Sequence, residues 1–243
     1  MSSRAISKVQ KNRSLPSKQS SKVKQVLAEY RARNEASPIF ISNCVATSQF
    51  EHNIDIRKVA WLCYGELDPS TFAAAKFRMG HSNSRALVFS SGKVVCTGAA
   101  SVGELLLSVQ ELQIMINKVH PGNQCLNTIV QNIVSTAWVG GNIDLIKLHD
   151  FLLKKGICDA CYTPELFPGL RFSAQSLLPN LPKVKVIVFS IGNIVLTGGK
   201  QMSDITTSYE YVKQLLPHFF SEKKISHKEI MSHIDKKRKT KKN

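Results

Sequence analysis

The chain has 243 residues, 43% of them hydrophobic and 21% charged, enough to fill the core of one large domain or two small ones. No stretch approaches the roughly 18 consecutive apolar residues of a membrane-spanning helix, and we expect no secretory signal at the basic N-terminus. Six cysteines are too few for a disulfide scaffold and fit a reducing compartment. The formal net charge of +16 predicts an acidic partner.

The positive charge is concentrated at the two ends. Residues 1–35 and residues 223–243 each carry nine Lys or Arg and two acidic residues, whereas residues 36–222 carry 15 basic and 13 acidic ones. The composition predicts a disordered basic N-terminal arm (1–35), a nearly neutral folded core, and a basic C-terminal tail (223–243). The run Lys236–Lys242 fits a nuclear localisation signal, a phosphate-binding tail, or a tail that only aids solubility.

The core contains an internal repeat. Four segments recur in the same order: Asn43–Val45 as Asn132–Val134, Asn53–Ile56 as Asn142–Leu145, Pro69–Phe72 as Pro164–Phe167, and Phe89–Gly98 as Phe189–Gly198. Four ordered matches indicate a duplicated unit of roughly 90 residues. We therefore divide the core into a first repeat over 36–128 and a second over 129–222.

Each repeat is expected to begin with a strand, near 38–47 and 130–139, followed by a short amphipathic helix. The apolar positions of these helices are Ile56, Val59, Ala60 and Cys63 in the first repeat, and Leu145, Leu148 and Leu152 in the second. Gly65 and Gly156 are expected to take the left-handed conformation just past the helix ends.

Three or four strands are expected next, with hairpin turns at residues 90–93 and 190–193, where a glycine permits positive φ. A long helix closes each repeat. In the first, Ser101 and Glu104 fit a capping box. In the second, Ser203 is the expected cap and Pro217 bends or ends the helix.

Two such units can merge into one antiparallel sheet with helices on one face only, an α+β architecture. Strand alternation then places one set of residues on the open face: Asn43, Val45, Leu87, Phe89, Val95 and Thr97, with Asn132, Val134, Ile187, Phe189, Val195 and Thr197. An exposed apolar sheet face marks a binding surface. Periodicity alone also allows the opposite assignment, with this set in the core.

The segments Phe89–Ala99 and Pro164–Gly169, together with the duplication, resemble the TATA-box-binding protein family of eukaryotic transcription factors over residues 38–222. The resemblance implies a saddle: one curved antiparallel sheet seated on a widened DNA minor groove, with helices on its convex face. Apart from the resemblance, Cys158 and Cys161 form the sole close cysteine pair and lack partners at zinc spacing, and the sequence shows no catalytic triad or nucleotide-binding motif. We therefore expect no enzymatic activity, cofactor, metal or small-molecule substrate.

The resemblance also assigns roles to residues. It implies that Phe72, Phe89, Phe167 and Phe189 wedge into base steps, and that Asn43 and Asn132 contact minor-groove acceptors of A·T pairs. It further implies minor-groove contacts from Val45, Leu87, Val95, Thr97, Val134, Ile187, Val195 and Thr197.

Some family positions differ in this chain. Arg78 and Lys93 match implied phosphate contacts, but Asn83, Ser173 and Asn193 stand where the family has basic residues. We therefore hypothesise that the basic ends supply part of the counterion release. An unchanged salt dependence after removal of both ends would reject that hypothesis.

The resemblance implies a contact with transcription factor IIB through Glu165 and Leu166. It also implies a strongly basic helix that contacts transcription factor IIA, but Lys118 is the sole basic residue over 101–119. This difference weakens the case for binding of transcription factor IIA. These departures indicate a divergent member: a paralogue, a protist form or a viral homologue. We expect it to nucleate pre-initiation complexes with the RNA polymerase machinery in the nucleus, or in a cytoplasmic viral factory if it is viral.

Two other functions remain open. One is a protein-interaction factor that kept the fold but lost tight TATA binding. The other is an RNA-binding module that acts through its basic ends alone.

Overall fold

A computed structural model of the chain describes residues 38–80 and 82–222; both predicted basic ends, including Lys236–Lys242, lie outside these ranges. The described residues form one eight-stranded antiparallel sheet in the order β2-β3-β4-β1-β5-β8-β7-β6. Counted outward from the central pair β1 and β5, each half shows the same succession of strands. This arrangement confirms the predicted α+β class and the duplication.

The first half contains four strands and two helices. They are β1 (Ile39–Phe50), α3 (Ile56–Cys63), β2 (Ala74–Arg78), β3 (Arg85–Phe89), β4 (Lys93–Ala99) and α4 (Val102–Asn117). The second half contains β5 (Cys125–Trp138), α5 (Leu145–Lys154), β6 (Leu170–Ser173), α6 (Ala174–Leu177), β7 (Lys185–Val188), β8 (Asn193–Gly199), α7 (Met202–Leu215) and the 3₁₀ turn η1 (Leu216–Phe219). Both first strands are longer than expected, because they pair with each other along most of their length.

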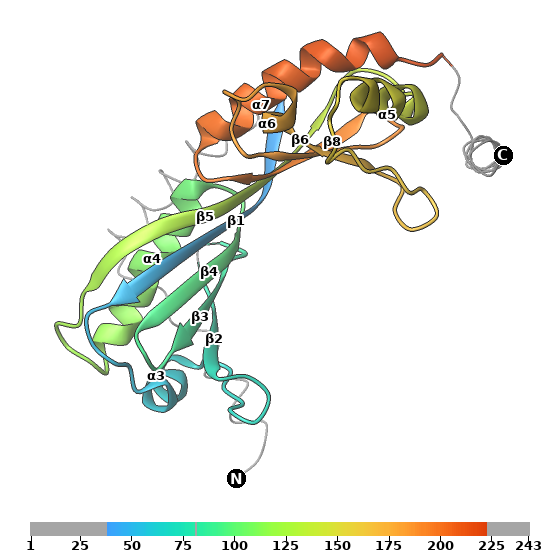
Figure 1. Ribbon diagram of the computed structural model, residues 1–243. Helices are drawn as coiled ribbons and strands as arrows, with labels where there is room; N and C mark the ends of the chain where they lie inside the picture. The colour runs from blue at the N-terminus through green and yellow to red at the C-terminus, as the bar shows by residue number, and fades with distance from the viewer. Residues whose placement is uncertain (1–37, 81, 223–243) are drawn as a thin grey trace.

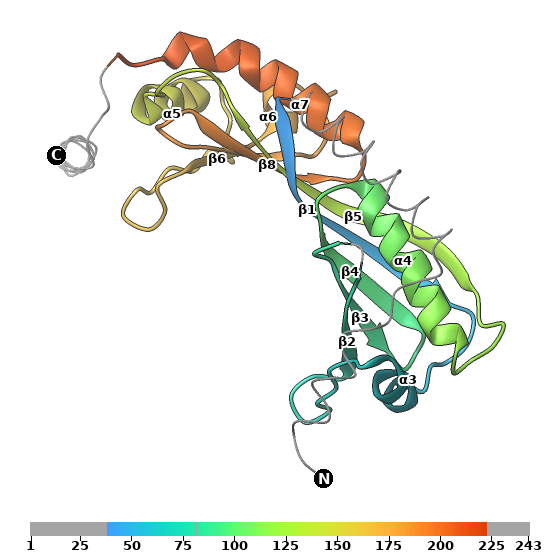
Figure 2. The same ribbon diagram turned by 180° about the vertical axis from the view of Figure 1, so that it is seen from behind.

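The sheet arches, and the two long helices α4 and α7 lie along its outer side (Figures 1 and 2). Helix α4 contacts β1, β3, β4 and β5, and helix α7 contacts β5 and β8. The inner side of the arch carries no helix of the described ranges (Figure 1). The molecule is therefore a two-layer saddle with one sheet face left open.

The core lies between the helices and the convex face of the sheet. Helix α4 buries Leu105, Leu112 and Ile116, and α7 buries Ile205 and Val212. Burial of a side chain of this size contributes about 1.5–3 kcal/mol. Because each long helix packs on its own half of the sheet, both halves have an apolar layer on the same face.

The two halves join along β1 and β5. Asn43 lies opposite Val134, and Val45 lies opposite Asn132, with a register shift on either side of this group. Each β-bulge inserts an extra residue and sharpens the local twist. The two asparagines consequently lie together at the centre of the sheet, related by the pseudo-dyad.

The start of α4 confirms one predicted cap, and the start of α7 corrects another. Ser101 accepts a hydrogen bond from the Glu104 amide, and the Glu104 carboxylate accepts one from the Ala100 amide. The prediction of Ser203 as the second cap is wrong. Helix α7 begins at Met202, where the Asp204 carboxylate accepts hydrogen bonds from the amides of Lys200 and Gln201 at 2.9 and 3.1 Å.

The glycine predictions are partly right. Gly156, Gly92 and Gly192 have φ of 77°, 82° and 83°, as expected. The prediction for Gly65 is wrong, because Tyr64 takes the left-handed conformation instead, with φ of 58°. A Cβ atom on Gly65 would lie 2.5 Å from the buried Phe77 ring, so this glycine serves close packing rather than chain reversal.

The second half differs by an insertion. The short helix α6 lies between β6 and β7, and the first half has no helix between β2 and β3. This helix accounts for the longer spacing from Phe167 to Phe189 than from Phe72 to Phe89. No helix in the described ranges is long and apolar enough to cross a bilayer.

Candidate nucleic-acid interface

The open face carries the residues that the strand alternation assigned to it. Along β4, Val94 and Cys96 are fully buried against the helices, whereas Val95 and Thr97 are half-buried. The same alternation holds in β8, where Ile194 and Leu196 are buried and Val195 and Thr197 are not. Asn43, Val45, Leu87, Asn132, Val134 and Ile187 are also half-buried, and each lies next to at least one buried residue. The structure therefore decides between the two assignments, and the predicted set faces away from the helices.

The four phenylalanines form two matching pairs, one at each end of the open face. The rings of Phe72 and Phe89 lie edge to face, with centroids 6.0 Å apart and planes at 65°. The rings of Phe167 and Phe189 repeat this geometry at 5.8 Å and 62°. None of the four is buried beneath a helix, and Phe72 is 39% exposed. Each pair presents a planar apolar edge to whatever occupies the face.

The second pair packs closely against a glycine, Gly169, that sequence reasoning missed. A Cβ atom on Gly169 would lie 2.7 Å from the Phe167 ring and 3.2 Å from the Phe189 ring. A side chain at this position would therefore require the Phe167 ring or the Ile187 side chain to shift. The sequence signal was available, since Gly169 lies two residues after Phe167.

The two central asparagines are held in one orientation. The side-chain oxygen of Asn43 accepts hydrogen bonds from the Gly98 amide at 2.8 Å and the Thr97 hydroxyl at 3.3 Å. Asn132 accepts the equivalent bonds from Gly198 at 2.7 Å and Thr197 at 3.3 Å. Because a backbone N–H can only donate, these contacts fix the oxygen inward and leave the NH₂ group as the donor presented by each side chain. The face therefore offers two aligned donors at its centre.

Two basic side chains lie over the outer phenylalanines. The Lys76 ammonium is 5.5 Å from the centroid of Phe72, and the Arg171 guanidinium is 5.5 Å from that of Phe167. Each cation stands four residues after its phenylalanine, so the repeat contained a signal that sequence reasoning did not use. A cation over a ring contributes about 0.5–1 kcal/mol at an exposed site, and it places positive charge beside each ring pair.

The predicted phosphate contacts lie at the first-repeat end of the face. Arg78 and Lys93 are both exposed, and Arg78 lies opposite the exposed Arg85 on the neighbouring strand. Asn83 is exposed in the loop before Arg85. Their contact with DNA stays a prediction.

The open face also exposes three large apolar side chains that sequence reasoning missed. Phe40 and Ile129, 56% and 50% exposed, lie opposite Thr136 and Thr47 on the central strands. Trp138 is 60% exposed at the end of β5, and its indole N–H donates to the Ile191 carbonyl at 3.2 Å. The apolar floor of the face is thus wider than the repeat matches indicated.

The loop expected to contact transcription factor IIB lies before β6. The amides of Leu166 and Phe167 both donate to the Thr163 carbonyl, which forms a tight turn that points Leu166 outward with 87% of it exposed. Glu165 is exposed beside it. The two residues form an accessible acidic and apolar tip, and their role in partner binding stays a prediction.

The cysteines take no part in a metal cluster among the described residues, where no group of three or more His, Cys, Asp or Glu gathers. Burial, with a contribution from the charge of Glu104, raises the pKa of Cys44 to about 11. Burial likewise raises the pKa of Cys96 to about 12. These thiols stay protonated and pack as small apolar groups beneath the open face.

The fold and this face define a class: a duplicated saddle with a helix-free, pseudo-symmetric inner surface. The family model for transcription factor TFIID (or TATA-binding protein, TBP) matches residues 38–119 and 127–219, one match in each half. The chain therefore belongs to the TATA-binding-protein family, whose members are non-enzymatic transcription factors with a repeated domain.

Individual relatives agree with this family. TATA-box-binding protein 2 of Entamoeba histolytica is 34% identical over 184 residues, which cover 75% of this chain and 82% of that protein. TATA box-binding protein-like 2 of Mus musculus is 33% identical over 183 residues, 74% of this chain, and the match spans about half (49%) of the mouse protein. The solved structure of Methanococcus jannaschii TBP has a TM-score of 0.60 at 31% identity, covering 72% of this chain and 96% of that one. At these identities the chain is a divergent member.

Proposed function

We propose that this protein binds A·T-rich promoter DNA through the minor groove, bends it, and nucleates assembly of a pre-initiation complex. The observation that carries the proposal is the paired geometry of the open face. Two edge-to-face phenylalanine pairs, Phe72 with Phe89 and Phe167 with Phe189, flank a central pair of fixed amide donors.

The amide donors give a reason for sequence preference. In the minor groove, A·T pairs present only acceptors, namely adenine N3 and thymine O2, whereas a G·C pair adds the guanine amino donor. The inward oxygens of Asn43 and Asn132 leave donors facing the groove. A guanine amino group would meet these donors without an acceptor and would crowd the half-buried Val45 and Val134.

The phenylalanine pairs give a reason for bending. Unstacking a base step costs a few kcal/mol, and an inserted planar apolar side chain restores part of the lost stacking contact. Because the pairs stand at the two ends of an arched sheet, two kinks would fit the duplex to the curvature. The exposed Arg78 and Lys93 would supply phosphate contacts in the first repeat.

The partners follow from the same proposal. The exposed tip of Glu165 and Leu166 would receive a transcription factor IIB-like protein, and contacts with transcription factor IIA and RNA polymerase machinery would complete the assembly. The proposed site of action is the nucleus.

A second candidate function is a protein-interaction factor that has lost tight TATA binding. The observation that favours it is the loss of basic residues in the second repeat, where Ser173 and Asn193 stand at positions equivalent to Arg78 and Lys93. The four phenylalanines and two asparagines argue against this alternative.

A gel-shift titration separates the two functions. We expect the full chain to bind a TATA-containing duplex at least about tenfold more tightly than a GC-rich duplex of equal length, since each well-formed base contact contributes about 1–3 kcal/mol. Equal binding to both duplexes would contradict the proposal. Binding that depends only on residues 1–35 and 223–243 would instead favour an RNA-type or non-specific module.

A further inference from the structure

The equivalent positions of the two repeats carry unequal charge, and the strand registers define which positions are equivalent. In the first repeat Arg78 pairs with Arg85, which in turn pairs with Thr97. In the second repeat Ser173 pairs with Lys185, which pairs with Thr197. At the hairpins, Lys93 lies opposite Gln49, and Asn193 lies opposite Trp138.

The first-repeat cations are available to a ligand. Arg78, Arg85 and Lys93 are exposed on the open face. The ion pairs found over 38–80 and 82–222 are Lys147 with Asp144 and Lys185 with Asp159, so none of these three cations is in one.

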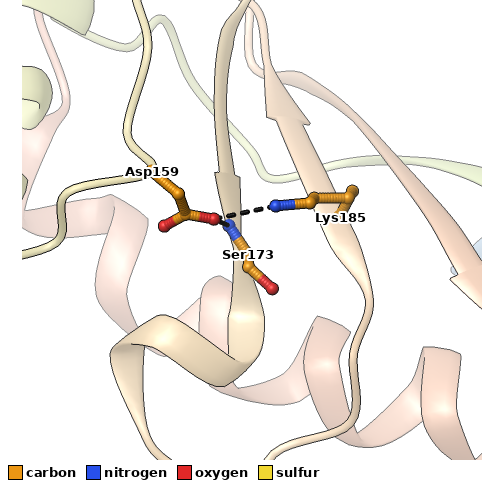
Figure 3. Close-up of polar contacts among 3 residues, drawn as sticks. All are labelled: Asp159, Ser173 and Lys185. Carbon is orange, nitrogen blue, oxygen red and sulfur yellow. Dashed lines mark hydrogen bonds and ion pairs between the residues drawn. The ribbon is translucent and has the colours of Figure 1, made fainter.

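Lys185, the second-repeat cation at the position equivalent to Arg85, is already engaged. The Lys185 ammonium lies 2.8 Å from a carboxylate oxygen of Asp159, and the same oxygen accepts a hydrogen bond from the Ser173 amide at 2.9 Å (Figure 3). Asp159 lies in the loop between α5 and β6, which is longer than the equivalent loop between α3 and β2. The Asp159 carboxylate thus contacts both Ser173 and Lys185. These two residues stand at the positions equivalent to Arg78 and Arg85.

The Asp159 carboxylate is ionised at neutral pH. Partial burial raises its pKa, but hydrogen bonds from Lys185, Ser176 and Ser173, with the charge of Lys185, outweigh burial and leave the pKa below its usual value. The two groups therefore form an ion pair, in which the Asp159 charge offsets that of Lys185.

We infer that the bound duplex is held electrostatically by the first repeat and mainly by apolar contact at the second, with Asp159 keeping Lys185 from phosphate contact. The inference rests on the proposed DNA binding and deepens it. At the second-repeat hairpin the exposed Trp138 ring stands beside Asn193, where the first repeat has a polar and a basic residue. Arg171 over Phe167 is the counterpart of Lys76 over Phe72, so each end of the face has one cation beside its outer phenylalanine.

The test is the salt dependence of TATA-duplex binding by single-residue variants of the full chain. Each phosphate contact contributes about 0.9 to the slope of log affinity against log salt concentration. Arg85→Ala should make the slope shallower by about this amount. Lys185→Ala should leave the slope unchanged, because Asp159 already engages this lysine. The two residues are otherwise matched, since both are exposed and lie opposite equivalent threonines in the sheet.

Asp159→Asn supplies the converse result. The asparagine oxygen can still accept from the Ser173 amide, but the charge that engages Lys185 is gone. The slope should steepen by about 0.9, and binding at low salt should tighten several-fold. Adding Lys185→Ala to Asp159→Asn should remove this gain. Unchanged thermal unfolding of each variant is the control for folding.

Two results would overturn the inference. One is a loss of slope in Lys185→Ala as large as in Arg85→Ala; the other is an unchanged slope in Asp159→Asn. Should Asp159→Asn fail to fold, the Arg85 and Lys185 comparison decides alone. Absence of any TATA preference in the unmodified chain would instead contradict the proposed function itself.

Discussion

Replacing Phe89 and Phe189 together with alanine is expected to remove at least half of the DNA bend and to weaken binding to a TATA duplex strongly. Each ring packs edge to face on its partner, Phe72 or Phe167, so its loss also leaves the partner without lateral support. Stacking of a base on an aromatic side chain contributes about 1–3 kcal/mol per contact. Fluorescence energy transfer between dyes at the duplex ends measures the bend, and a titration gives the affinity.

The matched control for the wedge variant is Ile114→Ala. Ile114 is also a large exposed apolar residue, 48% accessible, but it lies on α4, on the opposite side of the sheet. Its replacement should leave bend and affinity unchanged. A bend that is the same in the double phenylalanine variant and in the unmodified chain would count against the wedge roles.

Replacing Asn43 and Asn132 together with aspartate is expected to abolish preferential binding to A·T-rich DNA. The aspartate oxygen can still accept from the amides of Gly98 and Gly198, so the local fold is retained. The NH₂ donor, however, becomes a charged acceptor that faces the acceptors of the A·T minor groove. Loss of two contacts of about 1–3 kcal/mol each predicts a drop in affinity of at least about tenfold for the TATA duplex. Parallel titrations with TATA and GC-rich duplexes measure it.

A charge control accompanies this variant. Gln110→Glu adds one negative charge, against the two added by the double aspartate variant, and lies exposed on α4, away from the open face. It should reduce binding to both duplexes slightly and equally. Retained TATA preference in the double aspartate variant would show that the amides do not read the groove.

Much of the fold followed from the repeat. Alternation along β4 and β8 and the match between Phe89–Gly98 and Phe189–Gly198 were enough to place the hairpins and one candidate binding face. The choice between that face and its opposite needed the structure, because Val94 and Val95 are equally apolar and only their burial separates them.

Other features depend on contacts between distant segments. The role of Gly65 is set by the Phe77 ring, and the start of α7 by Asp204, whose carboxylate accepts hydrogen bonds from the amides of Lys200 and Gln201. The pair of Lys185 and Asp159 joins a strand to a loop that is longer in the second repeat than in the first. Comparison of the two repeats could not reveal it, since the first repeat holds no equivalent of Asp159.

The central claim is that the open sheet face reads DNA from the minor groove, and inosine substitution tests it most directly. An inosine·cytosine pair lacks the guanine amino group, so it matches A·T in the minor groove but resembles G·C in the major groove. We predict that a duplex with every A·T pair of the TATA element replaced by inosine·cytosine is bound and bent like the TATA duplex, whereas G·C replacement abolishes binding. Binding of the inosine duplex as weak as that of the G·C duplex would contradict the account.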